Sequence, residues 1–405
     1  MSRVRAATQD EIRRHNLARV VRRLHLGGPA SRSDLVAITG LNRSTVGALI
    51  SELGQFGLVA EEAGAAGGIG RPSLRAVPVP ESAVAVAFDL RVERTVAALV
   101  GLGGTVFERR EVSHNRTDFS PKAAARHLAG LAAELLEQAP SHAAWMGTGV
   151  GVPGVIDHRD GRIRVAPNLS WVDAPLAALV DDALQEVFGA APPVIVGNDA
   201  DLGAIAEHAR GAGTGHQNVI YLSGEIGIGG GFIVDGRLMV GAGGYGGEIG
   251  HMVVRRGGHT CLCGNRGCWE TEVGRDALLR ATGRPIDTGD VAEVLAAAAA
   301  GDERTLAGLA EVGEWLGLGL GNLVNAFNPE VIVLGGHFRQ LLPFVTQQID
   351  EQIGRAMLAS REQVTIMPSS FGGDSTLIGA AEVAFQPLID DPVGALTDTA
   401  VSLAG

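Results

Sequence analysis

Residues 246–270 read GGEIGHMVVRRGGHTCLCGNRGCWE, and they carry the most informative side chains of this 405-residue chain. All three cysteines of the protein, Cys261, Cys263 and Cys268, lie in this stretch together with His251. Zinc prefers thiolate and imidazole ligands, and four of them complete the tetrahedral shell of a structural site, whereas a catalytic site keeps one position open. The stretch therefore predicts one structural Zn²⁺ per chain, with these four residues as its ligands.

Two other readings of the cysteines are possible. They could be buried thiols that cluster by chance, or two of them could form a disulfide. The disulfide is disfavoured because the count is odd and nothing in the sequence indicates export. Two acids flank the stretch: Glu248 lies three residues before the histidine, and Glu270 lies two residues after the last cysteine. A metal here would fix a loop that presents both carboxylates to one cavity.

The bulk composition favours a cytoplasmic protein of two or three domains without a membrane partner. No apolar run reaches the roughly 18 residues of a membrane helix, and the N-terminus lacks the apolar region of a signal peptide. The net charge is −12, but it is divided unevenly. Residues 1–80 hold 11 Arg and 6 Asp plus Glu (+5), and the remainder holds 22 basic and 39 acidic groups (−17). A basic head joined to an acidic body suggests a fused nucleic-acid-binding module.

The head shows the pattern of a helix-turn-helix. Apolar spacing predicts a helix over residues 8–26, which Gly27-Gly28-Pro29 ends. Ser31-Arg32-Ser33-Asp34 has the form of a capping box and starts a second helix that ends near Gly40. Asn42 can cap a third helix that runs to about Gly54. Two helices joined by a tight glycine-containing turn form this motif.

The expected DNA contacts follow from that motif, because the first residues of its second helix face base edges. We therefore predict contacts to double-stranded operator DNA from residues at the starts of these two helices: Ser31, Arg32, Asn42, Arg43, Ser44 and Thr45. Strands over 58–61 and 73–79 would form a hairpin wing. At its tip, Gly70-Arg71-Pro72 resembles the minor-groove insert of AT-hook peptides, so Arg71 is a further predicted contact. The alternative is a three-helix protein-interaction module with a flexible linker.

The body alternates strands and helices, which is typical of an α/β fold with ligands at the carboxyl ends of the strands. A helix is predicted over residues 121–138. Predicted strands cover residues 83–88, 94–100, 146–152, 193–196, 219–223 and 331–336. Two such halves can enclose a cleft.

Several motifs give the chain a resemblance to a known family. They are Gly151-Val152-Pro153-Gly154, Ala166-Pro167-Asn168-Leu169, Asn198-Asp199-Ala200-Asp201, Gly227-Ile228-Gly229-Gly230-Gly231, Gly247-Glu248-Ile249-Gly250-His251 and the cysteine segment 261–270. With these, the chain resembles the ROK family (repressors, open reading frames and kinases), and specifically its repressor branch, over essentially its full length.

The resemblance implies a particular architecture. It implies an α/β, actin/hexokinase-like two-lobed body behind an N-terminal winged helix-turn-helix domain, with a structural zinc and a sugar pocket between the lobes. The expected domains are the head, 1–80, a first lobe, 81–200, completed by a C-terminal helix over 376–395, and a second lobe, 201–375, with the zinc site. A homodimer or homotetramer is implied as well.

Sugar recognition needs several groups that bind paired hydroxyls. The candidate sugar-binding residues are Asn168, Asn198, Asp199, Glu248, His251 and Glu270. The resemblance implies that one nitrogen of His251 meets zinc and the other a sugar hydroxyl, and that Asn168 makes a contact at the rim. The alternative for Asp199 is an N-cap for a helix over 202–210. The two glutamates could instead be surface carboxylates beside a metal knuckle.

A sugar kinase is the main alternative function, because family kinases use an aspartate at the position of Asp199 as general base. Their phosphate loops read Asp-x-Gly-x-Thr and Gly-Thr-Gly, whereas this chain has Asp89-Leu90-Arg91-Val92-Glu93-Arg94-Thr95 and Gly224-Glu225-Ile226-Gly227. Lost glycines and added carboxylates disfavour ATP. We therefore predict a sugar-responsive transcriptional regulator of carbohydrate metabolism genes, specifically a repressor. Its body would be non-catalytic, and its effector would be a sugar or a sugar phosphate. A regulator driven by a protein partner is the third possibility.

Overall fold

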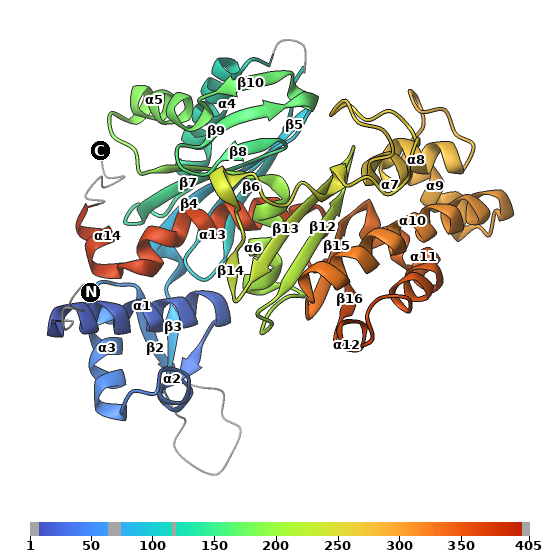
Figure 1. The fold of residues 1–405 in the computed structure, drawn as a ribbon. Helices are drawn as coiled ribbons and strands as arrows, with labels where there is room; N and C mark the ends of the chain where they lie inside the picture. The colour runs from blue at the N-terminus through green and yellow to red at the C-terminus, as the bar shows by residue number, and fades with distance from the viewer. Residues whose placement is uncertain (1–7, 64–73, 116–118, 399–405) are drawn as a thin grey trace, which may run out of the picture.

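The chain folds into a small helical head and a body built on two five-stranded sheets (Figure 1). The computed structural model describes residues 8–63, 74–115 and 119–398. Arg71, the predicted wing-tip contact, lies outside the described residues. No described helix is long and apolar enough to cross a membrane.

The head has three helices whose starts follow their capping residues. Thr8 caps α1 (Gln9–Gly27) and Ser31 caps α2 (Arg32–Thr39), each through a capping box. The side chain of Asn42 caps α3 (Arg43–Gln55). The wing strands are β2 (Val59–Ala63) and β3 (Leu74–Pro78), and a short strand, β1 (Ala30–Ser31), pairs with the outer edge of β3. The wing is thus a three-stranded antiparallel sheet rather than the predicted two-stranded hairpin.

The two sheets of the body share one connectivity. Each has three antiparallel strands followed by two parallel ones, so that the first strand lies in the centre. The first sheet has the order β11-β7-β4-β5-β6, with β4 (Ala83–Leu90), β5 (Arg94–Gly101), β6 (Val106–Ser113), β7 (Ala144–Val152) and β11 (Val194–Asn198). The second has the order β14-β13-β12-β15-β16, with β12 (Val219–Gly224), β13 (Ile228–Val234), β14 (Arg237–Leu238), β15 (Val331–Gly336) and β16 (Thr365–Pro368).

Helices α6 (Asp199–Arg210) and α13 (Ser375–Asp390) lie between the two sheets (Figure 1). Helix α13 packs on β4 and β7 of the first sheet, and α6 packs on β12 and β13 of the second. The two helices also cross closely, because a side chain at Gly379 of α13 would collide with the Leu202 carbonyl of α6. The first lobe and the second lobe therefore meet through this pair of helices.

Other helices cover the outer faces of the sheets. Those of the first sheet are α4 (Pro121–Leu136) and α5 (Leu176–Phe188), and a small sheet adjoins them, formed by β8 (Val155–Asp157), β9 (Arg162–Ala166) and β10 (Trp171–Ala174). The second sheet is covered by a larger helical cluster, consisting of α7 (Trp269–Val273), α8 (Arg275–Ala281), α9 (Val291–Ala299), α10 (Glu303–Phe327), α11 (His337–Ile353) and α12 (Leu358–Arg361).

The head is packed directly onto the body. Helix α1 contacts α13 and α14 (Pro392–Asp398), and the hydrophobic core of the head continues into α13, β4 and β5. The ring of His25 in α1 lies 4.9 Å from that of Phe385 in α13. Only residues 79–82 separate β3 of the wing from β4 of the body. The position of the head is therefore set by the packing of α1 on α13.

Two predicted helices have the wrong bounds. The C-terminal helix expected over 376–395 is divided into α13 (Ser375–Asp390) and α14 (Pro392–Asp398), because the backbone of Asp391 is not helical. The helix expected over 202–210 begins at Asp199, and its N-cap is Asn198. The side chain of Asn198 accepts hydrogen bonds from the amides of Ala200 and Asp201, which satisfies the first turn. The alternative reading of Asp199 as the N-cap residue is wrong for the same reason, because Asp199 is the first residue of the helix.

Candidate functional site

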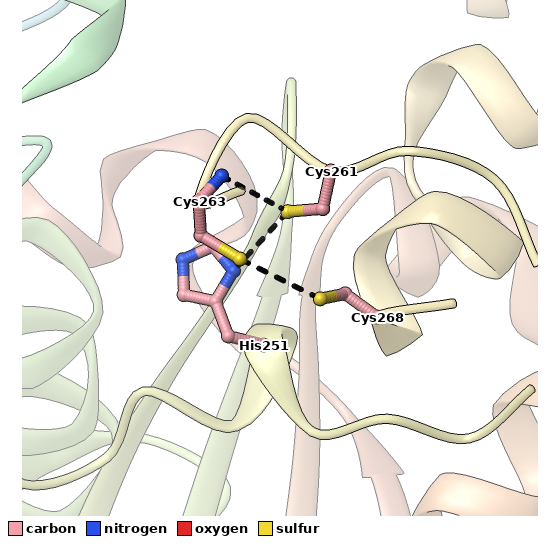
Figure 2. A group of neighbouring side chains, drawn as sticks. All are labelled: His251, Cys261, Cys263 and Cys268. Carbon is pink, nitrogen blue, oxygen red and sulfur yellow. Dashed lines mark hydrogen bonds between the residues drawn. The ribbon is translucent and has the colours of Figure 1, made fainter. Parts of the chain in front are cut away.

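His251, Cys261, Cys263 and Cys268 converge on one point (Figure 2), and their ligand atoms all lie within 4.8 Å of one another. Cys261 Sγ lies 3.5 Å from His251 Nδ1, and Cys263 Sγ lies 3.7 Å from Cys268 Sγ. Zinc–sulfur bonds of about 2.3 Å at tetrahedral angles would place neighbouring ligand atoms about 3.5–3.8 Å apart. The cluster therefore has the spacing and the donor set of a tetrahedral metal site.

The loop that carries the cluster is anchored to the second lobe. Cys268 precedes α7, and the fully buried Trp269 donates a hydrogen bond from Nε1 to the carbonyl of Trp315 in α10 at 2.9 Å. The indole lies where Gly319 of α10 leaves room for it. Backbone bridges join Val253 to Cys268 and fold the loop back on itself. A metal bound here would connect this loop to the α10 layer.

A cleft of about 1040 Å³ opens between the lobes. Residues from both lobes line it, and all six predicted sugar-binding residues are among them: Asn168, Asn198, Asp199, Glu248, His251 and Glu270. Asn168 belongs to the 3₁₀ turn 167–169 beside β9, whereas the two glutamates and His251 belong to the second lobe. The cleft is bounded by carboxylates and amides, which suits a ligand rich in hydroxyl groups.

Asn198 and Asp199 stand at the N-terminus of α6. Asn198 donates from Nδ2 to the carbonyl of Gly154 at 3.0 Å, and its oxygen is used by the helix cap. Only one N–H of its amide is left for a ligand. Asp199 lines the cleft, and its Oδ1 accepts a hydrogen bond from the amide of Ala200. Burial raises the pKa of Asp199 to about 7, and the nearby carboxylate of Asp89 acts in the same direction.

His251 connects the metal cluster to the cleft. Its Nδ1 faces Cys261 and lies 3.5 Å from Glu270 Oε1, while its Nε2 lies 4.0 Å from Glu248 Oε2. A metal on Nδ1 would leave Nε2–H as a donor toward the cleft. Burial raises the pKa of Glu248, and the opposing attraction of His251 only moderates it.

Sequence reasoning did not select several other groups in the cleft. Asp201, in the first turn of α6, is bonded to His158 Nε2 at 3.2 Å. Asp89 and Arg91 form an ion pair at 2.6 Å, and Glu225 lines the same end of the cleft. The pairing with His158 could not be read from sequence, because the two residues lie 43 positions apart. The sequence signal for Asp201 is its position two residues after Asp199, within the same helical turn.

The predicted DNA-contacting residues of the head differ in whether their side chains are already hydrogen-bonded within the protein. Asn42 Oδ1 accepts from the amide of Thr45 and the hydroxyl of Ser44, and Ser31 caps α2. Arg32 forms a two-pronged hydrogen bond with Glu61 of the wing at 2.9 and 3.0 Å. Arg43 is exposed, and its side chain makes no hydrogen bond or ion pair with the described residues. Among the described residues of this set, Arg43 is therefore the most available to a base.

Comparison with known proteins identifies the class. The sequence profile of the ROK family matches residues 85–386, and the chain belongs to the ROK family. It is 30% identical over 386 residues to the xylose repressor of Bacillus spizizenii. The aligned region covers 95% of this chain and 98% of that repressor.

Solved structures agree with this assignment. A ROK family transcriptional regulator, a homolog of the E. coli MLC protein, superposes with a TM-score of 0.77 at 25% identity and covers 96% of this chain and 99% of its own. A ROK family glucokinase from Streptomyces griseus, solved with glucose and AMPPNP, has a TM-score of 0.63 at 25% identity. It is matched over 99% of its length by 75% of this chain. The predicted family and fold are confirmed, and the likeness to the regulator extends over nearly the whole chain.

Proposed function

We propose that this protein is a sugar-responsive transcriptional repressor whose head binds operator DNA and whose cleft binds the effector. The observation that carries the proposal is that a helix-turn-helix head packs on a ROK body. The whole arrangement superposes on nearly the full length of a ROK transcriptional regulator. For the domains we propose the division predicted from the sequence: head 1–80, first lobe 81–200 completed by the C-terminal helical segment, and second lobe 201–375. The test is operator binding by the purified protein with and without sugar. Release that needs a further protein would favour the partner-driven alternative.

The effector we propose is an uncharged sugar. Asp199, Glu248 and Glu270 line the cleft with acceptor groups for hydroxyls, and a phosphate placed beside these three carboxylates would be repelled. The similarity to xylose repressors makes D-xylose the first sugar to test. A calorimetric panel of D-xylose, D-glucose and their phosphate esters would identify the class. Tighter binding of a phosphate ester than of its parent sugar would contradict this assignment.

The metal we propose is Zn²⁺, in a structural role. The His251 imidazole and three thiolates form a donor set that zinc prefers, and the spacing of the cluster fits a closed tetrahedral shell. Bound there, the ion would supply folding energy and fix the orientation of His251. His251 would then direct its second nitrogen toward a sugar hydroxyl, with Glu248 and Glu270 beside it.

ATP-dependent sugar phosphorylation is the alternative function, since a ROK glucokinase shares the body fold and Asp199 is in the cleft. We propose that the body is not catalytic. Arg91 is held by Asp89 and by the carbonyl of Gly373, so it bridges the place where the first phosphate loop of kinases lies. Glu225 adds a carboxylate at the second loop. Coupled ATP hydrolysis with D-xylose and D-glucose should stay at background. Turnover that depends on sugar would overturn this part of the proposal.

Arg43→Ala should weaken operator binding by roughly 1–3 kcal/mol if the guanidinium reads a guanine, and should relax specificity at that position. Arg43 lies in the first turn of α3, exposed and free of internal partners in the described structure. The measurement is affinity for an operator selected from a randomised duplex library and for variants at each position. Arg110→Ala is the control, because it removes the same charge from a body residue that is paired with Glu134. Parent-like binding by Arg43→Ala would exclude the proposed docking. The contact by Arg71 stays a prediction of its own.

We propose a homodimer or homotetramer, because one small head rarely supplies enough specificity. Two heads should protect half-sites related by two-fold symmetry and separated by about one helical turn, roughly 34–36 Å, or a multiple of it. Footprinting on the selected operator, combined with light scattering of the free protein, tests this expectation. Protection of a single asymmetric half-site by a monomer would refute it.

A further inference from the structure

A buried polar cluster joins the head to the body. Its centre is His25, near the end of α1, which is completely buried. The amide of Gly103 donates to His25 Nδ1 at 3.0 Å, so the ring proton is on Nε2, which lies 3.2 Å from Glu382 of α13. Both ring nitrogens of His25 therefore have a hydrogen-bonding partner. These contacts connect a head residue with two separate parts of the first lobe.

Arg210 completes the cluster, and it is the last residue of α6. Its Nε donates to Glu382 Oε1 at 2.5 Å. Its Nη1 donates to the carbonyl of His25 at 2.9 Å and to that of Gly103 at 3.2 Å. One guanidinium thus bonds the backbone of the head, the backbone of the first lobe and a carboxylate of α13. The side chains of Arg210 and Glu382 are only 15% and 8% exposed, so water screens their ion pair weakly.

The opposite end of the same helix lies in the sugar cleft. Helix α6 has 12 residues and begins with Asp199, so it reaches from the cleft to the head over about 18 Å. Helix α6 packs closely against β13 and α13, because a side chain at Gly231 of β13 or at Gly379 of α13 would collide with a backbone carbonyl of α6. A displacement at its first turn would therefore move the helix as a unit rather than bend it.

We propose that α6 transmits cleft occupancy to the DNA-binding head, with Arg210 as the positioning residue that couples the two. This inference rests on the proposed function of the cleft as a sugar site. A sugar that bridges Asp199 and the second-lobe glutamates binds one lobe arrangement better than another, and it shifts α6 by that difference in affinity. The Arg210 end then changes its bonds to the carbonyls of His25 and Gly103, and α1 moves with them.

The other polar contacts between head and body do not reach α6. Arg22 pairs with Asp390 at 3.0 Å, and Arg14 pairs with Asp391 at 3.4 Å. Both pairs are exposed, and exposed pairs contribute little because water and salt screen them. Removing either pair provides a matched control, because it alters the interface between head and body without altering any contact of α6.

The test compares the full-length parent, Arg210→Gln and Asp390→Ala. D-xylose is the probe sugar, or the tightest binder of the calorimetric panel if that differs, and the operator is the duplex selected from the randomised library. Calorimetry gives sugar affinity without DNA, and fluorescence anisotropy gives operator affinity with and without saturating sugar. Hydrogen exchange of α1 (Gln9–Gly27) reports movement of the head. Glu382→Gln, which keeps the shape of its side chain, is the second variant if Arg210→Gln does not fold.

In the parent and Asp390→Ala, sugar should change operator affinity by about 5–150-fold and alter exchange at the His25 end of α1. In Arg210→Gln, sugar affinity should be kept, but the change in operator affinity should fall below about threefold and the exchange response should disappear. A parent-like response in Arg210→Gln overturns the inference, and so does loss of its sugar affinity, which would place Arg210 in the cleft architecture. A parent that binds sugar without any operator response overturns the proposed function itself, a result the variants cannot mimic.

Discussion

Replacing Cys268 with serine is expected to release the bound metal and to lower the melting temperature of the body sharply. Cys268 is completely buried and comes directly before Trp269, which is anchored to α10. Binding of a structural zinc is folding free energy, with apparent values of about 10–16 kcal/mol in zinc-finger peptides, so the loss of one ligand removes a large stabilising contribution. Metal analysis should return about one zinc per parent chain and almost none for the variant, and calorimetry should show the loss of stability.

The matched control for this prediction is Leu262→Ser. Leu262 lies between two of the ligands, and its side chain is 85% exposed, so the substitution alters the same loop without altering the donor set. This variant should keep both its zinc and the melting temperature of the parent. A Cys268→Ser protein that retains one zinc per chain would contradict the ligand assignment. A parent without metal that still binds sugar would contradict the structural role.

The second large effect is expected from Asp199→Ala, which should abolish the sugar response and leave operator affinity without sugar nearly unchanged. Asp199 lines the cleft, and the Ala200 amide that its Oδ1 contacts is also bonded by the Asn198 cap, which would still hold the first turn of α6 in the variant. Removing the carboxylate should therefore eliminate a sugar acceptor without unfolding the helix. Calorimetry gives sugar affinity, and anisotropy gives operator affinity. Asp182→Ala, an exposed carboxylate on α5, is the control.

The same residue predicts a pH dependence. Since burial raises the pKa of Asp199 to about 7, the carboxylate of the free protein is ionised above this pH and protonated below it. The ionised carboxylate accepts hydrogen bonds from sugar hydroxyls better than the protonated form does, so sugar affinity should fall as pH decreases through 7 and level off above about pH 8. Asp199→Asn should lose this dependence. Equal slopes for the parent and Asp199→Asn would show that another group controls binding.

Local signals in the sequence predicted the helices of the head and several strands of both large sheets. Thr8, Ser31 and Asn42 each begin a helix of the head because their side chains satisfy N–H groups that the first turn leaves free. The motifs around Glu248 and His251 likewise predicted residues that line one cleft. For α6 the apolar pattern predicts a start at Leu202, three residues after the observed start at Asp199, because the helix is capped by Asn198.

The contacts that the sequence did not reveal join residues distant in the chain. His25 and Glu382 lie 357 positions apart, and Arg210 and Glu382 lie 172 apart. No periodicity or capping pattern relates such residues, because their proximity depends on how α1, α6 and α13 pack. The hydrogen bonds from Arg32 to Glu61 and from Asn198 to Gly154 also join residues that are distant in the sequence. Residue type indicated that these side chains bond to something, and only the fold identified the partner.

The shared core of head and body also limits how such a regulator can be recombined. Because apolar side chains of α1 and α13 belong to one cluster, an excised head would expose the surface that α13 now covers. In a chimaera that joins this head to another sugar-sensing body at residues 79–82, α1 would pack against a helix whose side chains differ from those of α13. Exchange of operator specificity between relatives should therefore succeed by grafting the first turn of α3 alone, or by moving the head together with the outward face of α13. Whole-head swaps at the linker should yield poorly folded proteins.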